Sequence, residues 1–88
     1  MGADFFYLMD MLAPEQSRAA RGWLDWTQEE LAKRANVSLS TVRDFEKGRR
    51  TPIGNNLAAI RGVLEDAGVS VTHDGDGHPT GISIARAA

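Results

Sequence analysis

Cysteine is absent from this chain of 88 residues. Its absence excludes disulfide bonds, thiolate metal sites and cysteine nucleophiles, and it suits the reducing cytoplasm, where we expect the protein to work. A long apolar run is also missing, because Asp4 and Asp10 interrupt the apolar N-terminal residues and no basic residue precedes them. That stretch therefore fits neither a signal peptide nor a membrane span, and no membrane partner is expected.

Signs of catalysis and of a bound cofactor are equally scarce. No pair of residues offers a convincing nucleophile and base, and no glycine-rich phosphate loop is present, so neither an enzyme nor a cofactor is expected. The run from Asp74 to Gly77 resembles the start of a calcium loop, but the third acidic position and the closing glutamate are missing. His73 and His78 flank it without further ligands. A plain hairpin loop is therefore favoured over a metal site.

An overall positive charge, which is usual for a protein that binds nucleic acid, is missing as well, because the formal net charge is -2. The charges are unevenly distributed, however. Residues 33–61 hold seven basic and two acidic side chains, and both flanking segments are acidic. This basic block offers candidates for contacts with phosphates, namely Lys47, Arg49, Arg50 and Arg61. An ordinary solvated surface is the alternative interpretation.

Two short helices joined by a tight turn are predicted between residues 27 and 48. Thr27 and Glu30 have the spacing of a capping box, in which each side chain satisfies a backbone N–H, so the first helix begins at Gln28. Asn36 ends that helix, because asparagine tolerates the left-handed conformation at a helix C-terminus.

The second helix begins after Ser38, which can cap it, and ends at Gly48. Val42 and Phe45 lie three residues apart and face inward. Six side chains remain available to solvent or a ligand: Leu39, Ser40, Thr41, Arg43, Asp44 and Lys47. Two such helices, joined by a turn of about three to four residues, form the unit whose second helix lies in a DNA major groove.

The stretch from Gln16 to Val71 resembles the Cro/C1-type helix-turn-helix family, also called the XRE family, of phage repressors, antitoxins and small bacterial regulators. The resemblance implies a mainly α, lambda-repressor-like bundle of about four helices that binds double-stranded DNA and regulates transcription, as a repressor does. The matching features are Arg21, the run from Trp26 to Ala32, the Asn36-Val37-Ser38 turn, Ser40-Thr41-Val42, Phe45-Glu46-Lys47-Gly48, Arg49-Arg50-Thr51-Pro52 and Asn56-Leu57.

The resemblance also implies roles for individual residues. Thr27 and Gln28 are expected to approach phosphates, and Thr41 to contact either backbone or base. The residues expected to face bases are Leu39, Ser40, Arg43 and Asp44. Leu39 departs from the polar residue often found there, and it fits either contact with a thymine methyl group or docking in a protein interface. An ion pair between Arg21 and Glu46 is implied, which ties the first helix of the domain to the end of the recognition helix.

Helices are predicted on both sides of the motif, within a domain of residues 13–68. Pro14 fits the first turn of a helix that runs to about Leu24, in which Gly22 allows close packing and the inward residues are Ala20, Trp23 and Leu24. Asn55 or Asn56 is expected to cap a last helix that ends at Gly68, with an inner face of Leu57, Ile60, Leu64 and Ala67.

Residues 69–88 are predicted to form a β-hairpin, where the most familiar version of the family has a fifth helix. Two alternating stretches, residues 69–72 and 82–84, flank a loop rich in glycine, aspartate and proline. A hairpin alone is marginal in water, so its apolar side must cover the helices or pair with another subunit. The Cro branch offers a precedent for dimerisation through C-terminal strands. A homodimer in which the sheet continues across a two-fold axis is preferred over packing on the parent domain, because helix-turn-helix readers gain specificity from two half-sites. The predicted dimer residues are Val69, Val71, Ile82 and Ile84.

Residues 1–12 form an apolar arm in this prediction, and three interpretations stay open. The arm can pack on its own domain, it can dock on a partner or a second subunit, or Met11 can be an alternative start. Packing of Phe5, Phe6 and Leu8 on the domain or on a second subunit is favoured.

The function predicted from these features is a dimeric regulator that reads a two-fold operator through residues 38–47. The alternative is a protein-interaction module, an antitoxin or antiactivator, that uses the same fold to bind a toxin or an activator.

Overall fold

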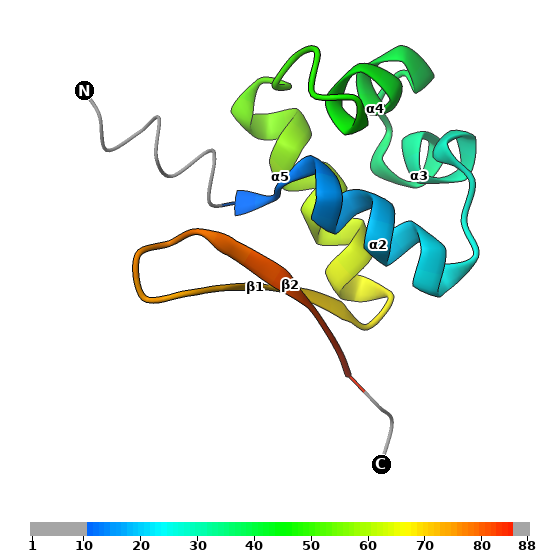
Figure 1. Ribbon diagram of the computed structural model, residues 1–88. Coiled ribbons are helices and arrows are strands. Elements are labelled where there is room, and N and C mark those ends of the chain that lie inside the picture. The colour runs from blue at the N-terminus through cyan, green and yellow to red at the C-terminus, as the bar shows by residue number, and fades with distance from the viewer. Residues whose placement is uncertain (1–10, 86–88) are drawn as a thin grey trace.

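The computed structural model describes residues 11–85, so the predicted packing of Phe5, Phe6 and Leu8 lies outside the described residues. Within that range four helices are followed by an antiparallel hairpin (Figure 1), which confirms the predicted mainly helical bundle with a C-terminal hairpin. The elements are α2 Pro14–Leu24, α3 Gln28–Ala35, α4 Leu39–Glu46, α5 Gly54–Asp66, β1 Val69–His73 and β2 Pro79–Ile84. None of these four helices is both long and apolar enough to cross a membrane.

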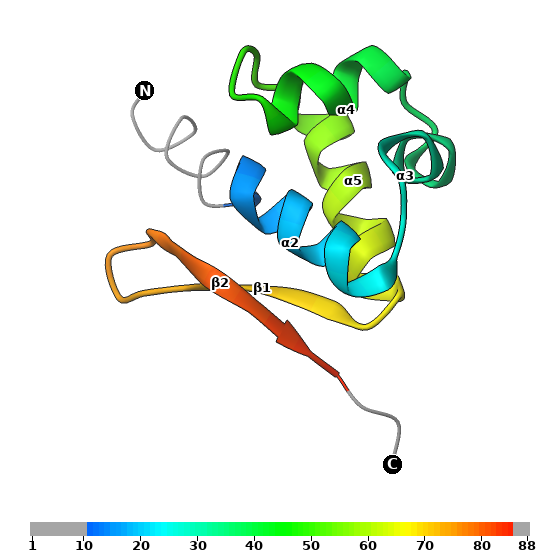
Figure 2. The same ribbon diagram turned by 45° about the vertical axis from the view of Figure 1, so that its right-hand side comes forward.

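The hairpin and the pair formed by α3 and α4 lie on different sides of the molecule. β1 packs against α5 and β2 packs against α2. α3 contacts both α4 and α5, and α4 also contacts α2. Two views of the ribbon show α4 and the loop after it at the end of the bundle opposite the hairpin (Figure 1, Figure 2). A ligand of α4 therefore approaches the domain from the side that the hairpin does not cover.

Local side-chain caps set the ends of α3 and α4 as predicted. Thr27 Oγ1 accepts a hydrogen bond of 3.0 Å from Glu30 N, and Thr27 N donates one of 3.0 Å to Glu30 Oε1. Asn36 adopts the left-handed conformation with a φ of 58°. Ser38 Oγ accepts a 3.1 Å hydrogen bond from Thr41 N. These caps satisfy backbone groups that a helix leaves unpaired at its ends, so they fix the turn between the two helices.

The core lies between the helices and extends to the start of β1. Its largest fully buried side chains come from every helix region, and Val69 of β1 is 0% exposed. Met11 and Leu12 are also buried, and Arg61 Nη1 donates a 3.0 Å hydrogen bond to Met11 O. The core therefore includes the last two residues of the segment predicted as an arm. The fully buried aliphatic residues are Leu12, Leu31, Val42, Leu57, Ile60, Leu64 and Val69.

Two predictions about α2 are wrong. Trp23 was expected to face inward, but it is 58% exposed. The inner side of α2 is formed by Gln16, Ser17 and Ala20, which are buried, so the helix is rotated away from the orientation that would bury Trp23. Gly22 is exposed, and a Cβ at this position would meet nothing within 4 Å, so no close packing requires glycine there.

The ends of α5 also differ from the prediction. The helix begins at Gly54 with Ile53 as its N-cap, so neither Asn55 nor Asn56 caps it. Ile53 O accepts from the N–H groups of Asn56 and Leu57, which is how a residue just before a helix starts its hydrogen-bond ladder. Ala67 is exposed because the helix ends at Asp66 and Ala67 already belongs to the following turn.

The two strands of the hairpin extend further than the alternating stretches 69–72 and 82–84 that predicted them. The reason is that hydrogen bonds close the loop between them tightly. Asp74 Oδ1 accepts hydrogen bonds of 2.9 Å from the N–H groups of both Asp76 and His78, and Asp74 N donates one of 2.9 Å to His78 O. Strand pairing therefore resumes at Pro79, opposite His73, rather than at Ile82. Only residues 74–78 remain as the loop.

Gln16 fastens the hairpin to α2. Its Nε2 donates hydrogen bonds of 2.9 Å to Thr72 O and 3.0 Å to Gly81 O, one on each strand. Its Oε1 accepts a 2.9 Å bond from Ala13 N at the start of the helix. Because Gln16 is itself buried, the bond from Ala13 N orients its amide, and the two bonds from Nε2 hold both strands against α2.

Candidate nucleic-acid interface

The two faces of α4 differ sharply in chemistry. Val42, Phe45 and Glu46 are buried against the domain, whereas Ser40 and Arg43 are exposed. Leu39, Thr41 and Asp44 are half-buried at the border between the two faces. The residues predicted to contact bases therefore all lie on the outer face of α4 or at its border: Leu39, Ser40, Thr41, Arg43 and Asp44.

Three hydroxyl groups meet at the N-terminal end of α4. Ser38 Oγ lies 2.7 Å from Thr41 Oγ1 and 3.1 Å from Ser40 Oγ, both at hydrogen-bond distance. A hydroxyl both donates and accepts, so this cluster keeps free capacity for a polar ligand. The start of α4 consequently presents groups that can bond to either a phosphate or a base edge.

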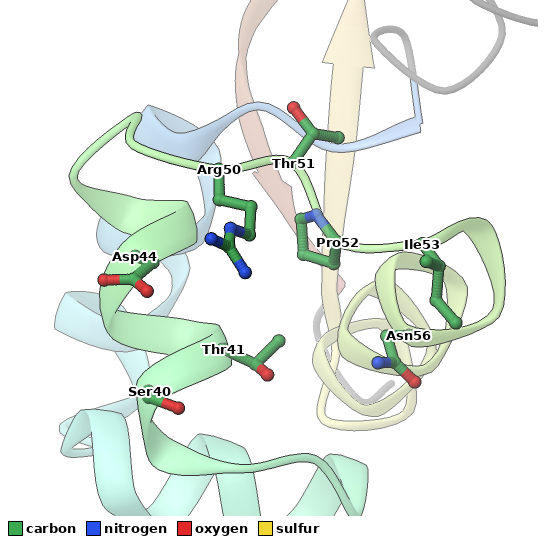
Figure 3. A pocket seen from close by; sticks show the side chains of 8 residues that line it. All are labelled: Ser40, Thr41, Asp44, Arg50, Thr51, Pro52, Ile53 and Asn56. Carbon is green, nitrogen blue, oxygen red and sulfur yellow. The ribbon is translucent and has the colours of Figure 1, made fainter.

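A groove separates α4 from the start of α5 (Figure 3). It has a volume of about 240 Å³, with Thr41 pointing toward it from α4 and Arg50 extending into it from the loop. Ile53, at the far rim, is 70% exposed. The groove thus joins the predicted base-contacting face to one predicted phosphate contact. Its lining residues are Ser40, Thr41, Asp44, Arg50, Thr51, Pro52, Ile53 and Asn56.

The loop after α4 carries an exposed group of cations, Lys47, Arg49 and Arg50. Gly48 begins the loop with a φ of 74°, a conformation that favours glycine. Asp44 O accepts from Arg49 N at 2.9 Å and from Arg50 N at 3.4 Å, so the backbone of the loop is held against α4. These hydrogen bonds hold the beginning of the loop in place, so its cations lie directly beside the outer face of α4.

The basic block separates into cations that are paired within the chain and cations that are not. Arg61 was a candidate for phosphate contact, but its Nε lies 2.9 Å from Glu65 Oε2 and its Nη1 bonds to Met11 O. Among residues 11–85, no ion pair involves Arg43, Lys47, Arg49 or Arg50. Six cations of the block thus form no ion pair within this range. Four of them lie on α4 and the loop after it, and the other two, Lys33 and Arg34, lie on α3.

Glu46 connects this helix to the rest of the domain. Its side chain is 1% exposed, and its Oε1 lies 2.7 Å from Arg21 Nη2 in an ion pair. Arg21 Nε also donates to both carboxylate oxygens, Ser17 Oγ donates to Oε2 at 2.6 Å, and Gln28 Nε2 donates to Oε1 at 3.0 Å. Arg18 donates to the backbone carbonyl of Glu46. One residue of α4 is thus held by side chains from both α2 and α3.

The protonation of this cluster follows from its hydrogen bonds. Burial alone would raise the pKa of Glu46, but the hydrogen bonds from Arg21, Ser17 and Gln28, with the charge of Arg21, hold it below its ordinary value. The hydrogen bond to Glu46 likewise raises the pKa of Arg21. Both groups are therefore charged at neutral pH, and both carboxylate oxygens of Glu46 accept hydrogen bonds.

Sequence reasoning missed part of this cluster. Gln28 was expected to approach phosphate, yet one of its two amide N–H groups is used by Glu46. Ser17 was assigned no role, although it lies one helical turn before Arg21 and on the same face, which is the available signal. Thr27 is exposed at the start of α3, where its Oγ1 accepts from Glu30 N.

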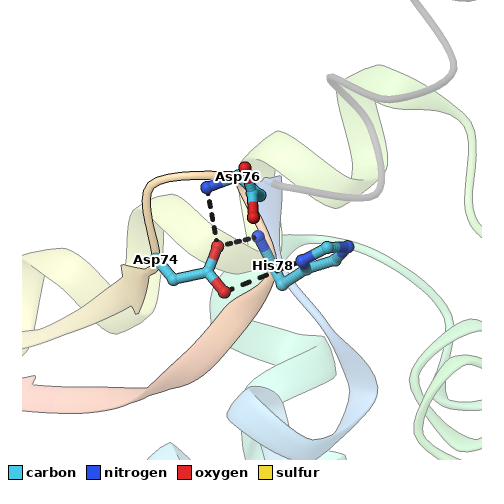
Figure 4. A group of neighbouring side chains, drawn as sticks. All are labelled: Asp74, Asp76 and His78. Carbon is cyan, nitrogen blue, oxygen red and sulfur yellow. Dashed lines mark hydrogen bonds and ion pairs between the residues drawn. The ribbon is translucent and has the colours of Figure 1, made fainter.

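The loop of the hairpin brings Asp74, Asp76 and His78 together (Figure 4). Their ligand-type atoms lie within 4.8 Å of one another, and all three residues are exposed. The backbone N–H of His78, followed by that of Asp76 and by the imidazole of His78, lowers the pKa of Asp74. These bonds belong to the closure of the loop, so the carboxylate of Asp74 already has a structural role.

The predicted dimer residues face the domain to which they belong. Val69 is buried in the core, and Val71, Ile82 and Ile84 are half-buried against it. Their side chains thus cover α2 and α5 of the same chain.

Comparison with known proteins gives one informative match. A family model described as helix-turn-helix matches residues 18–65, which is more than half of the chain. The match includes α3, α4, the cationic loop and nearly all of α5, and it excludes the hairpin. No curated protein matches the sequence.

Proposed function

Because the chain belongs to the Cro/C1-type helix-turn-helix family of DNA-binding regulators, we propose that it is a sequence-specific transcriptional regulator that reads double-stranded DNA through residues 38–47. One observation carries this proposal. The outer face of α4, the groove beside it and the unpaired cations of the following loop form one continuous surface. Such a surface combines base-reading groups with phosphate-binding charge, as a helix in the major groove requires.

The outer face of α4 offers a different contact at each base-reading position. Arg43 is exposed and carries the paired donors that match the O6 and N7 atoms of guanine. The carboxylate of Asp44 accepts from the amino group of cytosine, and Leu39 suits a thymine methyl group. Ser40 and Thr41 each supply a hydroxyl at the groove. We therefore expect sequence preference to depend chiefly on Arg43 and Asp44.

Phosphate contacts are proposed on both sides of this face. Lys47, Arg49 and Arg50 supply charge from the loop, and the hydroxyl of Thr27 supplies a donor at the start of α3. Gln28 keeps one amide N–H for a phosphate while the other bonds to Glu46. Cations of this kind release condensed counterions from DNA, so affinity should fall steeply with salt.

Two copies are proposed to bind one operator. A single α4 of eight residues reads a short stretch of DNA, and a dimer reads two half-sites about 34 Å apart. The operator should then have two-fold symmetry, because the symmetry of the protein is reflected in its site.

Selection of bound fragments from a random DNA pool, followed by affinity measurements at several salt concentrations, tests this function. The selected operator should lose about 1–3 kcal/mol of affinity with Arg43→Ala, and the preference at one base position should relax. Lys33→Ala is a matched control, since Lys33 is an exposed cation of α3 that does not line the groove. Unchanged operator affinity in a folded Arg43→Ala protein would remove the assignment. A protein with no salt-dependent DNA binding would instead be an interaction module.

A further inference from the structure

Ile53 is a large apolar side chain that the fold leaves in water. Among residues 11–85, only Ile53 and Trp23 are large apolar residues with an exposed side chain. Ile53 lines the groove between α4 and the start of α5, hereafter the α4–α5 groove, on the side of α5 (Figure 3). Thr41 points toward the same groove from α4. The exposed isoleucine therefore borders the surface that is proposed to read DNA.

The fold gives no reason for isoleucine at this position. Ile53 is the N-cap of α5, and its side chain makes no cap hydrogen bond. Serine, threonine, aspartate and asparagine are preferred at an N-cap, because their side-chain oxygen accepts from a free N–H of the first turn. Isoleucine has no such oxygen, and Ile53 does not belong to the hydrophobic core or to the side chains packed on it. A residue that departs from local preference without a gain in packing indicates a functional position.

The position of the α4–α5 groove determines which part of DNA it meets. A helix with its side chains is about 10–12 Å across, and the major groove of DNA is about 12 Å wide, so α4 alone fills it. Elements beside α4 therefore meet the sugar-phosphate strand that borders the major groove rather than base edges. The loop after α4 and the start of α5 are such elements, because they form the far wall of the α4–α5 groove.

Charged and apolar groups follow each other in this wall, as they do along a DNA strand. Arg50 extends into the α4–α5 groove, and within residues 11–85 it forms no ion pair, so its charge is available to a phosphate. Ile53 offers an apolar surface that suits the C–H groups of a sugar. The volume of about 240 Å³ is below the range of about 300–1,000 Å³ for pockets that enclose a small molecule. One sugar of a passing strand is therefore a better match than an enclosed effector.

We propose that Ile53 packs against the C2′ edge of one deoxyribose in each half-site, while Arg50 binds the neighbouring phosphate. This inference rests on the proposed function, because a strand reaches the α4–α5 groove only when α4 lies in the major groove. The contact also selects DNA over RNA. C2′ of deoxyribose carries only hydrogen, whereas the 2′-hydroxyl of ribose would be buried against Ile53 without a hydrogen-bond partner. Ile53 thus senses the sugar and not the base sequence.

Single ribonucleotides, placed one at a time along the selected operator, test the sugar contact. Each ribonucleotide also alters the duplex locally, so positions are compared within one scan. Wild-type protein should lose at least about threefold in affinity at one position of each half-site. Ile53→Ala should remove this dependence, and Ile53→Val, which keeps a branched apolar side chain, should retain it. Identical scans for wild type and Ile53→Ala would overturn the proposal.

Affinity for the unmodified operator gives a second readout. Ile53→Ala should weaken binding at least about fivefold on the operator and on unrelated fragments alike. The salt slope should stay unchanged, because an apolar contact releases no counterions, whereas Arg50→Ala should reduce the slope by about one. Asn55→Ala is the matched control, since Asn55 is exposed in the same turn of α5 but does not line the α4–α5 groove. An equal loss of affinity in Ile53→Ala and Asn55→Ala, or no loss in either, contradicts the contact.

Stability measurements separate this role from a structural one. Ile53→Ser places a hydroxyl at the N-cap, so its urea midpoint should equal or exceed that of wild type. A lower midpoint would show that Ile53 stabilises the fold, and the inference would fail. Wild-type protein that binds no DNA would instead refute the proposed function. Binding that depends on Arg43 but not on Ile53 refutes the sugar contact alone.

Discussion

The α4 end and the hairpin end of this molecule make their surfaces from different parts of the chain. At α4 the backbone is satisfied within a capped helix, and the surface consists of side chains such as Arg43 and Ser40. At the hairpin the apolar side chains are used within the chain's own core, and the outer edge of β2 presents backbone groups. On a surface made of side chains, the substitution of a single residue can change which ligand is bound. A surface made of backbone depends instead on which strands are free to pair.

The largest expected effect comes from Glu46→Ala, which should damage the α4 end. The substitution leaves the largely buried Arg21 without its partner and removes the anchor that joins α4 to α2 and α3. Loss of one partner of a buried pair costs about 3–5 kcal/mol, which is a large part of the stability of a small domain. Urea denaturation should show this loss, with Glu29→Ala, an exposed glutamate of α3, as the control. Equal midpoints for wild type and Glu46→Ala would contradict the anchoring role.

The hairpin end should respond most to Gln16→Ala. The substitution removes the donor to Thr72 O and Gly81 O and the acceptor of Ala13 N. Unsatisfied buried groups cost about 1–3 kcal/mol, so amide hydrogens of β1 and β2 should exchange faster while those of α4 change little. Ser83→Ala is the control, because Ser83 is exposed on β2. If protection fell equally at both ends, the two regions would be a single cooperative unit and the comparison would fail.

A smaller effect is expected from Ser38→Ala at the start of α4. Ser38 Oγ caps the helix and joins the hydroxyls of Ser40 and Thr41, and loss of such a cap costs about 1 kcal/mol. DNA affinity should fall with it, because the base-reading helix begins at the cap. Amide protection of β1 and β2 should stay unchanged, since the hairpin lies at the other end of the molecule. Ser70→Ala provides the matched serine control, and an equal loss of DNA affinity in both variants would argue against a role of the cap in DNA reading.

Mild acid should have the smallest effect. The pKa of Glu46 is held below its ordinary value, so its contribution to stability is complete above the unfolded-state pKa of about 4.3 and is lost as the pH falls through the lower, folded-state pKa. Urea midpoints at about pH 7 and pH 5 should therefore differ little on account of Glu46, and the loss should come below pH 4. Glu46→Gln should lack this acid-dependent component. A wild-type midpoint that falls early, between about pH 6 and pH 5, and does so only when Glu46 is present, would reverse the sign of the shift.

The features that sequence reasoning predicted well depend on neighbouring residues. The capping box of Thr27 and Glu30, the left-handed Asn36 and the cap by Ser38 each involve residues within one turn, so their geometry follows from the residue types. The hairpin followed from alternation in the same way, although its loop proved shorter. The ion-pair geometry of Arg21 and Glu46 required more, because 25 residues separate them and only the family resemblance implied the pair.

The errors share one physical origin, which is packing between distant segments. The rotation of α2 is set by contacts with β2 and with Glu46, and neither can be read from the residues around Trp23. Gln28 appeared to be a surface residue because its acceptor lies on another helix. Arg61 appeared to be a free cation until the segment at Met11 was placed beside it. Local sequence patterns identified the α4 surface. They could not show which nearby side chains, such as Gln28 and Arg61, already form hydrogen bonds within the domain.

Consecutive residues at the start of α2 connect the two ends of the molecule. Gln16 bonds to the hairpin while Ser17 bonds to Glu46 of α4, so the distance between the two ends is set by one rigid helix rather than by a flexible linker. In a dimer that joins through the hairpin, as the sequence predicts, α2 therefore fixes the separation of the two reading helices. Insertion of one base pair between the half-sites rotates one half-site by about 35° relative to the other, and a rigid connection cannot follow that rotation. The operator should accordingly tolerate base changes at its centre far better than a change in its length.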